Sequence, residues 1–304
     1  MQKIIEKCIP LAIIIFTVFT AVLSDSAAQS VKSSLAFCLN CLIPALVPMT
    51  VMSYLMSLYE GEIFPKGILK RISKTLHINS YVLKIFLLGL ISGHPNGAVI
   101  CKNLYLNKKI SKKDAETCIA VSNNASPGFV ISYVGASVLH SAAKGALIFA
   151  LNSILSFVFL CAMPRSKIAY EKSEQCAENK NFVQNMVLSI QNSCESILKI
   201  CSNVVFFSMV CDLFMQRKNT VLQCYLCGIT EISKGIQHLS NFGGSLYEPA
   251  IVSCIGFSGI CVIFQVASAV SGSGLSVKKF VIVKSLYAIL LPALYFLTKK
   301  IFSL

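Results

Sequence analysis

The sequence has few charged residues and no polar stretch long enough to form a separate soluble domain. Only 13% of its 304 residues are charged, whereas 55% are hydrophobic, and the mean hydropathy is +0.70. A soluble domain of this size rarely has such a composition. Several apolar runs contain the roughly 17–25 residues that are needed to cross a bilayer core. The chain is therefore predicted to be an all-α polytopic membrane protein.

The sequence also lacks the motifs of the common enzyme classes. It contains no P-loop, no GxSxG, no HExxH and no carboxylate pair at a useful spacing. The absence of a P-loop argues against ATP as an energy source within this chain. We expect neither catalysis nor a bound cofactor.

Acidic residues are scarce, since 27 Lys and Arg stand against 13 Asp and Glu, for a formal net charge of +14. No basic-aromatic patch lies outside the loops, so a nucleic-acid partner is not expected. The basic residues gather in short loops that hold Lys66–Lys74, Lys108–Lys113, Arg165–Lys180 and Lys278–Lys279. By the positive-inside rule these loops and the N-terminus are predicted to be cytoplasmic. A positive potential would also attract anionic solutes.

The 14 cysteines lie mostly within apolar runs. Two pairs, CLNC at 38–41 and CYLC at 224–227, have a spacing typical of metal sites. No His-x-x-x-His partner accompanies them, and buried Cys behaves as a small hydrophobic residue that suits helix packing in lipid. We interpret these cysteines as packing residues, and we expect no metal site and no disulfide framework.

The apolar runs divide the chain into four parts. Residues 1–33 hold a first membrane helix, interpreted as an uncleaved signal-anchor, and a connector. Residues 34–164 and 184–304 are interpreted as two gate-type repeats, separated by a polar cytoplasmic linker at 165–183. Each half has a long helix, a short interrupted segment and a second broken segment near a Lys-rich loop. This shared layout suggests repeats of inverted orientation, with re-entrant hairpins that meet near the bilayer midplane.

Four apolar segments are interrupted by Gly, Pro, Asn or other polar residues. The interruptions are SGHPNGA (92–98), SNNASPGF (122–129), GITEISKG (228–235) and GFSGICVIFQ (256–265). Unwound backbone cannot face lipid, so it must be buried in protein or line a polar cavity. In secondary transporters the N-termini of paired broken helices point at the substrate. The alternative for any single break is a Pro/Gly kink or an ordinary loop.

Polar side chains at the breaks are the candidate solute contacts. Glu231 is the first candidate, because an ionisable group at membrane depth is costly and suggests proton coupling or solute contact. The alternative places Glu231 in a loop at the water interface, paired with Lys234. His94 is either a solute-contacting imidazole or a hydrogen-bonded group at the break, and Asn residues also commonly cap broken helices. Weaker candidates are Glu195, expected to be buried, and Asp212, expected near an interface. The predicted binding set is Gly93, His94, Asn96, Gly97, Asn123, Asn124, Ser126, Thr230, Glu231, Ser233, Ser258, Gly259 and Gln265.

Taken in order, these motifs resemble those of a known family. The stretch GHPNGA…ISKKDAETCIAVSNNASPGFVISYVG, the element GITEISKG and the element GFSGICVIFQ are similar to elements of the YlbJ-type sporulation integral membrane proteins, which contain nucleoside-recognition gate domains. The resemblance covers most of the chain. This sequence departs from the family pattern at His94, Asn96, Ser233 and Ile263.

The resemblance implies a transporter-like fold that is distantly related to concentrative nucleoside carriers. It also implies a role in endospore formation, in which dipicolinic acid is moved into the forespore across the outer forespore membrane. Helix N-termini, Asn groups and a basic protein suit this small planar dicarboxylate. A nucleoside-like solute transporter and a non-transporting scaffold for spore assembly remain alternatives. The expected location is the cell membrane or outer forespore membrane of a spore-forming bacterium, with a coupling proton or cation and the oligomeric state left open.

Overall fold

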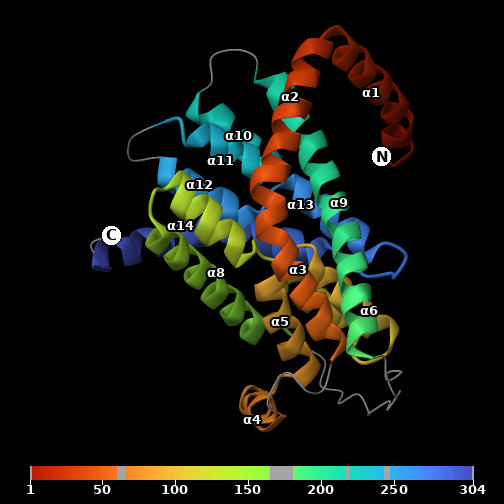
Figure 1. The fold of residues 1–304 in the computed structure, drawn as a ribbon, viewed down its shortest axis with the longest axis vertical. Coiled ribbons are helices and arrows are strands. Elements are labelled where there is room, and N and C mark those ends of the chain that lie inside the picture. Colours follow the sequence, from red (N-terminus) through yellow and green to blue (C-terminus); the bar gives the residue numbers. More distant parts are fainter. Residues whose placement is uncertain (1, 60–65, 165–180, 216–219, 243–246, 303–304) are drawn as a thin grey trace.

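The protein is described by a computed structural model over residues 2–59, 66–164, 181–215, 220–242 and 247–302, and every regular element in these ranges is a helix (Figure 1). Five helical stretches in this part of the chain are long and apolar enough to cross a membrane. They are Ser24–Leu58, Ala142–Ala162, Phe182–Phe214, Tyr247–Val270 and Lys278–Lys300. The predicted all-α polytopic class is confirmed, and the protein is an integral membrane protein.

The N-terminal helices differ from the prediction. Helix α1 spans Gln2–Val22, and α2 (Ser24–Phe37) continues through a π-helical turn (Cys38–Leu42) into α3 (Ile43–Leu58). The predicted boundary after residue 33 therefore cuts through one continuous helix. In Figure 1, α1 turns back from the start of α2, and its Phe16 and Phe19 rings contact those of Phe206 and Phe214. Its assignment as a signal-anchor stays a prediction.

Small polar residues explain why α2 begins at Ser24, ten residues before residue 34, where the first repeat was predicted to begin. Ser30 and Ser34 are buried, and α2 packs along α9 (Phe182–Phe214). The Ser30 hydroxyl donates a hydrogen bond of 2.6 Å to the Asp212 carboxylate on α9. Small side chains let two membrane helices approach closely, so a stretch of low hydrophobicity becomes part of a packed helix pair.

The basic stretch predicted as a loop contains a helix, α4 (Lys66–Leu76). Its sequence alternates basic and apolar residues with a helical period, which is typical of helices that lie in the membrane interface. Figure 1 shows α4 at one end of the helical assembly. The positive charges of this segment are therefore presented along a helix at the end of the molecule.

Both halves of the chain contain the same order of elements: a long helix, two broken helices and a further long helix. After α2–α3, the first half has α5 (Ser80–Ser92), α6 (Asn96–Leu106), α7 (Lys112–Ser122), η2 (Gly128–Val138) and α8 (Ala142–Ala162). After α9, the second half has α10 (Val221–Thr230), α11 (Ile232–Leu239), α12 (Tyr247–Phe257), α13 (Ile260–Val270) and α14 (Lys278–Phe302). A helix break lies inside each of the four predicted interruptions. Of the predicted linker 165–183, residues 165–180 lie outside the described residues.

Polar contacts join the two halves at one end of the molecule. The Lys102 ammonium donates a hydrogen bond of 2.8 Å to the carbonyl of Ser271. Lys279 lies 3.5 Å from the Glu116 carboxylate, which also accepts a hydrogen bond from the Ser276 backbone. The loop after α13 therefore contacts α6 and α7, although about half of the chain separates them in sequence.

A second ionic cluster lies near the opposite end of α14. Glu248, at the start of α12, lies 2.6 Å from Lys144 of α8 and 2.6 Å from Lys299 of α14. The Tyr295 hydroxyl donates a hydrogen bond of 3.3 Å to the same carboxylate. One carboxylate thus joins three helices, and its charge is balanced by two cations.

The hairpin of α10 and α11 depends on two facing glycines. A Cβ atom on Gly235 would lie 2.0 Å from the Cα atom of Gly228, and one on Gly228 would lie 2.4 Å from the sulfur of Cys254. No side chain larger than hydrogen fits between these backbones. The two halves of the broken helix can therefore lie against each other and against α12 only if both positions are glycine.

We predict that Gly235→Val disrupts this hairpin, because the added side chain would overlap the Gly228 backbone. The expected destabilisation is about 3 kcal/mol, at the upper end for overpacking, and it should appear as a lower melting temperature of the purified protein in detergent. The matched control is Gln237→Val, which places the same β-branched residue on the exposed side of α11. Equal melting temperatures for the two variants would contradict the close packing.

Candidate functional site

The first two breaks cross each other and exchange hydrogen bonds. The backbone N–H of His94 donates to the carbonyl of Asn124 at 2.9 Å. The backbone N–H of Ala98, in the first turn of α6, donates to the side-chain oxygen of Asn123 at 2.9 Å. A Cβ atom on Gly97 would lie only 3.0 Å from that oxygen, so glycine permits the contact. Each break thus satisfies backbone groups that the other has lost.

The other two breaks form a similar crossing in the second half. Glu231 has an extended backbone, with φ −137 and ψ 114, and its carboxylate accepts a hydrogen bond of 2.7 Å from the N–H of Lys234 at the start of α11. Gly259, with φ +89, lies against this segment, where its Cβ would be 3.3 Å from the Ile232 nitrogen. A positive φ favours glycine, and the Glu231 side chain serves as the N-cap of α11.

The two crossings face a common buried cavity of about 40 Å³. Its polar lining residues are His94, Ser126, Glu231, Ser233 and Gln265. The first four lie at three of the breaks, and Gln265 lies on α13, the helix that follows the fourth break. The cavity is far below the ~300 Å³ of a typical ligand pocket, and it has room for a few water molecules. The cavity is therefore too small, in this structure, to hold an organic solute.

Several buried polar atoms at these breaks have no hydrogen-bond partner among the described residues. They are both ring nitrogens of His94, both side-chain polar atoms of Asn96 and the side-chain oxygen of Gln265. An unsatisfied buried group costs about 1–3 kcal/mol. Such a cluster is unusual for groups that serve only to stabilise the fold, and a bound solute or water would satisfy it.

The predicted residues Asn123 and Asn124 hold the crossing together and do not line the cavity. Asn123 uses its oxygen for Ala98 and its amide N–H for the carbonyl of Ile119 at 2.9 Å. Asn124 donates to the carbonyl of Val121 at 2.9 Å and to the Ser156 hydroxyl at 3.0 Å. The structure therefore agrees with the capping alternative for these two residues.

Other predicted residues also lie outside the cavity. The Thr230 hydroxyl bonds to the carbonyl of Leu226 in its own helix, and its side chain lies on a different surface. Ser258, with φ 73, is buried and donates to the carbonyl of Ile255 at 3.3 Å. The predicted glycines act through the close approach of backbones rather than through the cavity lining; they are Gly93, Gly97 and Gly259.

Lys284, on α14, is a buried charge that the sequence analysis did not identify. Its side chain is fully buried, and its ammonium donates a hydrogen bond of 2.7 Å to the side-chain oxygen of Asn124. The ammonium also lies 5.2 Å from the ring centre of Tyr287 and 5.6 Å from that of Phe280. No described carboxylate forms an ion pair with Lys284. Its place within the last apolar run, beyond the Lys278–Lys279 pair, was a signal that could have revealed it.

Glu231 is buried, and its predicted alternative pairing with Lys234 is wrong. The Lys234 ammonium lies 2.9 Å from the Asp212 carboxylate, which also contacts the His238 ring at 3.2 Å. Glu231 instead receives the Lys234 backbone N–H and a long hydrogen bond of 3.5 Å from the Ser208 hydroxyl. The Asp212 carboxylate therefore pairs with the Lys234 ammonium of the α10–α11 hairpin. The Glu231 side chain remains in the wall of the cavity.

Glu195 was expected to be buried, and this expectation is wrong. Its side chain is 68% exposed and pairs at 2.6 Å with Lys199, one turn further along α9, which is 66% exposed. An exposed ion pair contributes little to stability. Its position along a membrane-spanning helix, however, shows that one face of α9 is polar.

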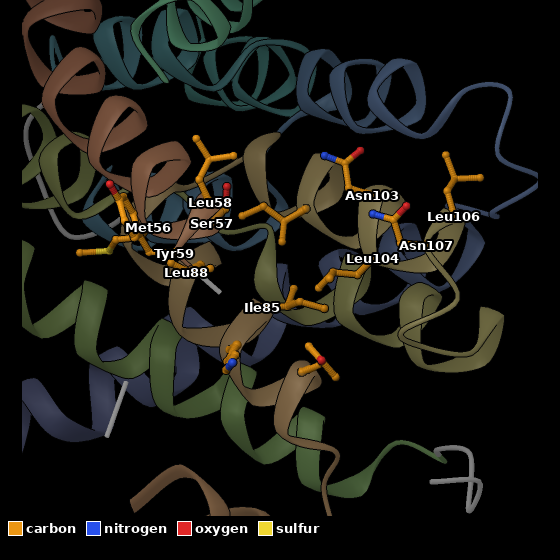
Figure 2. A pocket seen from close by; sticks show the side chains of 13 residues that line it. Met56, Ser57, Leu58, Tyr59, Ile85, Leu88, Asn103, Leu104, Leu106 and Asn107 are labelled. Carbon is orange, nitrogen blue, oxygen red and sulfur yellow. The ribbon is translucent and has the colours of Figure 1, made fainter. Parts of the chain in front are cut away.

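A larger hollow of about 320 Å³ lies away from the breaks, between the end of α3 and the helices α5 and α6 (Figure 2). Its lining is mostly apolar, and Tyr59, Asn103 and Asn107 are among its polar members. It shares no lining residue with the cavity at the breaks. This hollow is larger than the cavity at the breaks, but it does not lie where the breaks of the two halves meet.

The paired cysteines lie in helices and act as packing residues. Cys38, Cys224 and Cys227 are buried. In the part of the chain that the structure describes, no group of three or more His, Cys, Asp or Glu side chains could hold a metal ion.

Comparison with known proteins gives one informative relative. The chain is 22% identical over 312 aligned residues to the sporulation integral membrane protein YlbJ of Bacillus subtilis (strain 168), and the alignment covers 87% of this chain and 76% of the relative. No protein-family profile and no solved structure matches the chain. This similarity supports the resemblance to the YlbJ-type sporulation integral membrane proteins that the ordered motifs indicate.

Proposed function

We propose that this protein is a secondary transporter of a small organic anion, and that the anion is dipicolinic acid moved into the forespore during endospore formation. The solute class rests on the site described above. The choice of dipicolinate rests on the family resemblance. The reaction proposed is binding and translocation, with no chemical change in the solute.

The observation that carries this proposal is the convergence of the breaks on one buried cavity with unpaired polar groups. A scaffold protein would gain nothing from leaving His94, Asn96 and Gln265 without partners at membrane depth. For a carrier the same groups are useful, because they exchange bonds with water for bonds with a solute. The small volume of the cavity is consistent with a carrier in a closed state between two open ones.

Two features favour an anionic solute. Three helices begin at breaks beside the cavity, namely α6 at Asn96, η2 at Gly128 and α11 at Ile232. Helix N-termini carry a partial positive charge, which attracts negative ligands. When protonated, Lys284 adds a positive charge behind Asn124, and no carboxylate among the described residues pairs with it. In a medium of low dielectric constant such a charge acts over several ångströms.

Glu231 is the proposed coupling residue. It lies in the cavity wall, it is 1% exposed, and its neighbour Lys234 is already paired with Asp212. A carboxyl group in this position can carry a proton across with the anion and offset the negative charge of the solute. Its hydrogen bond to the α11 backbone links its protonation state to the hairpin that closes the cavity.

We also propose that the two halves are inverted repeats that alternate between faces. The same order of elements in both halves supports this proposal. The contacts at the helix ends support it too. Helices α6 and α7 meet the loop after α13, whereas Glu248 at the start of α12 meets Lys144 at the start of α8. Such a pairing of ends is expected when the second half runs in the opposite direction.

The proposal as a whole is tested by uptake of labelled dipicolinate into vesicles that contain only this protein, with and without a proton gradient. We expect accumulation that depends on the gradient and that unlabelled dipicolinate, but not uridine, competes away. Competition by uridine would favour a nucleoside-like solute. Absence of uptake of either solute by correctly folded protein would favour the scaffold alternative and contradict transport.

We predict that Glu231→Gln removes gradient-driven uptake and leaves the protein folded in the membrane. The amide keeps the size of the side chain and can still accept the Lys234 N–H, but it cannot carry a proton. The control is Asp25→Asn, which neutralises an exposed carboxylate at the start of α2. Uptake by the Glu231→Gln variant at the wild-type rate, with the same dependence on the gradient, would exclude the coupling role.

We predict that Lys284→Met weakens uptake of the dianion by on the order of tenfold, equivalent to about 1.4 kcal/mol. The loss should appear as a higher KM, because the positive charge behind the site is removed. Lys284→Arg should retain most of the activity, and Lys300→Met, at an exposed position of the same helix, should be neutral. A Lys284→Met protein with lower melting temperature and unchanged KM would show a structural role only.

A further inference from the structure

A polar groove of about 600 Å³ runs between α3, α6, α9 and α13, outside the closed cavity. Most of its lining residues are polar. They include Tyr54, Lys102, Asn103, Ser196, Lys199 and Asn203. A groove of this kind is unexpected on the side of a membrane protein, because lipid cannot hydrogen-bond to these groups.

The exposed surface of α9 is divided into two strips. Polar residues recur every three or four positions and face the groove; they are Asn192, Glu195, Ser196, Lys199, Ser202 and Asn203. Apolar residues with the same spacing form a second exposed strip, as Val187, Ile190 and Cys194. Residues at this spacing share one face of a helix. One face of α9 therefore suits lipid, and another suits water.

The polar strip lies at membrane depth. Helix α9 has 33 residues, whereas roughly 20 suffice to cross the hydrocarbon core. Even if the whole excess of about 13 residues lay before the core, the core would begin near residue 195. Most of the strip, including the Glu195–Lys199 pair, would still lie inside it. Charged side chains at this depth face a protein interior or a water-filled space.

The groove adjoins the cavity at the breaks. Gln265 and Ile200 line both of them, so these two side chains form the wall between them. Pro95, next to His94 of the cavity, also lines the groove. At its other end the groove reaches Lys102 and Asn103 of α6, near the Lys-rich loops. Gln265 is 4% exposed, and its side-chain oxygen has no partner among the described residues.

We infer that this groove is the aqueous path by which a small anion passes from the Lys-rich face to the breaks, and that Gln265 and Ile200 form its inner gate. The inference rests on the proposed function for the identity of the solute. Lys102 supplies positive charge along the path, whereas the charge of Lys199 is balanced by Glu195. The unpaired oxygen of Gln265 lies where the path meets the cavity. Displacement of these two side chains would join the groove and the cavity into one chamber.

Thiol labelling tests the path without any need for transport. Ser196→Cys and Ser202→Cys place thiols on the polar strip, and Ile190→Cys places one on the apolar strip of the same helix. A negatively charged, membrane-impermeant methanethiosulfonate reagent is applied to the Lys-rich face, and each site is followed by peptide mass. Only the thiolate reacts, and lipid suppresses its formation. The groove thiols should therefore react on the order of tenfold faster than Ile190→Cys and the native Cys194.

The gate is tested with a thiol inside the cavity. Ala125 lines the closed cavity, so Ala125→Cys alone should label slowly. Adding Gln265→Ala should raise the labelling rate of Ala125→Cys by on the order of tenfold. The smaller side chain would let water reach the thiol, and the solvated thiol can ionise to the reactive thiolate. The rate at Ser202→Cys should not change. An unaltered rate at Ala125→Cys in the double variant would remove Gln265 from the gate.

Groove thiols that react no faster than Ile190→Cys would overturn the path, because lipid or another protein copy would then cover the strip. This result is distinguishable from failure of the proposed function. A protein that labels as expected but does not transport dipicolinate would support the aqueous path and contradict dipicolinate as the solute. A protein that transports dipicolinate without labelling of the groove thiols would support dipicolinate as the solute and contradict the aqueous path.

Discussion

The structure depends on one constraint, which is that broken backbone inside a bilayer must find its hydrogen-bond partners within the protein. Lipid offers none, so each break has to be matched by another. In the first half the His94 N–H reaches the Asn124 carbonyl, and the Asn123 side chain caps the first turn of α6. In the second half the Glu231 side chain caps α11. The breaks therefore occur as crossing pairs, and glycines at the crossings are required by the distances.

This constraint divides the polar residues into two groups with different chemistry. Asn123 and Asn124 have their polar atoms occupied by protein partners, so they keep the first crossing rigid. His94 and Gln265, which line the cavity, keep theirs unused, and so does Asn96 at the start of α6. A rigid frame with a few unsatisfied groups resembles a preorganised binding site, in which the fold bears the cost of desolvation before the solute arrives. Lys284 is held by the rigid frame, because its ammonium donates a hydrogen bond to the Asn124 side-chain oxygen.

The breaks could be predicted because their causes are local. In the first break, Gly93 adopts a positive φ and Pro95 lacks a backbone N–H, and both features end a helix locally. The roles of the side chains at the breaks could not be predicted in the same way. Asn at a break can cap a helix or face a solute, and the choice depends on residues far along the chain. Thr230 illustrates the difficulty, since it adjoins the break yet bonds to its own helix.

The sequence by itself determined the membrane class, the positions of the helix breaks and the scarcity of charge that makes Glu231 informative. These follow from composition and from short-range backbone chemistry, which do not need a partner. Only the tertiary structure decided that Lys234 pairs with Asp212 and not with Glu231, that Lys284 lies behind Asn124, and that one face of α9 borders a polar groove. Each of these depends on contacts between distant segments. Which partner a buried side chain contacts depends on how distant segments pack together, and the spacing of residues within one segment does not determine it.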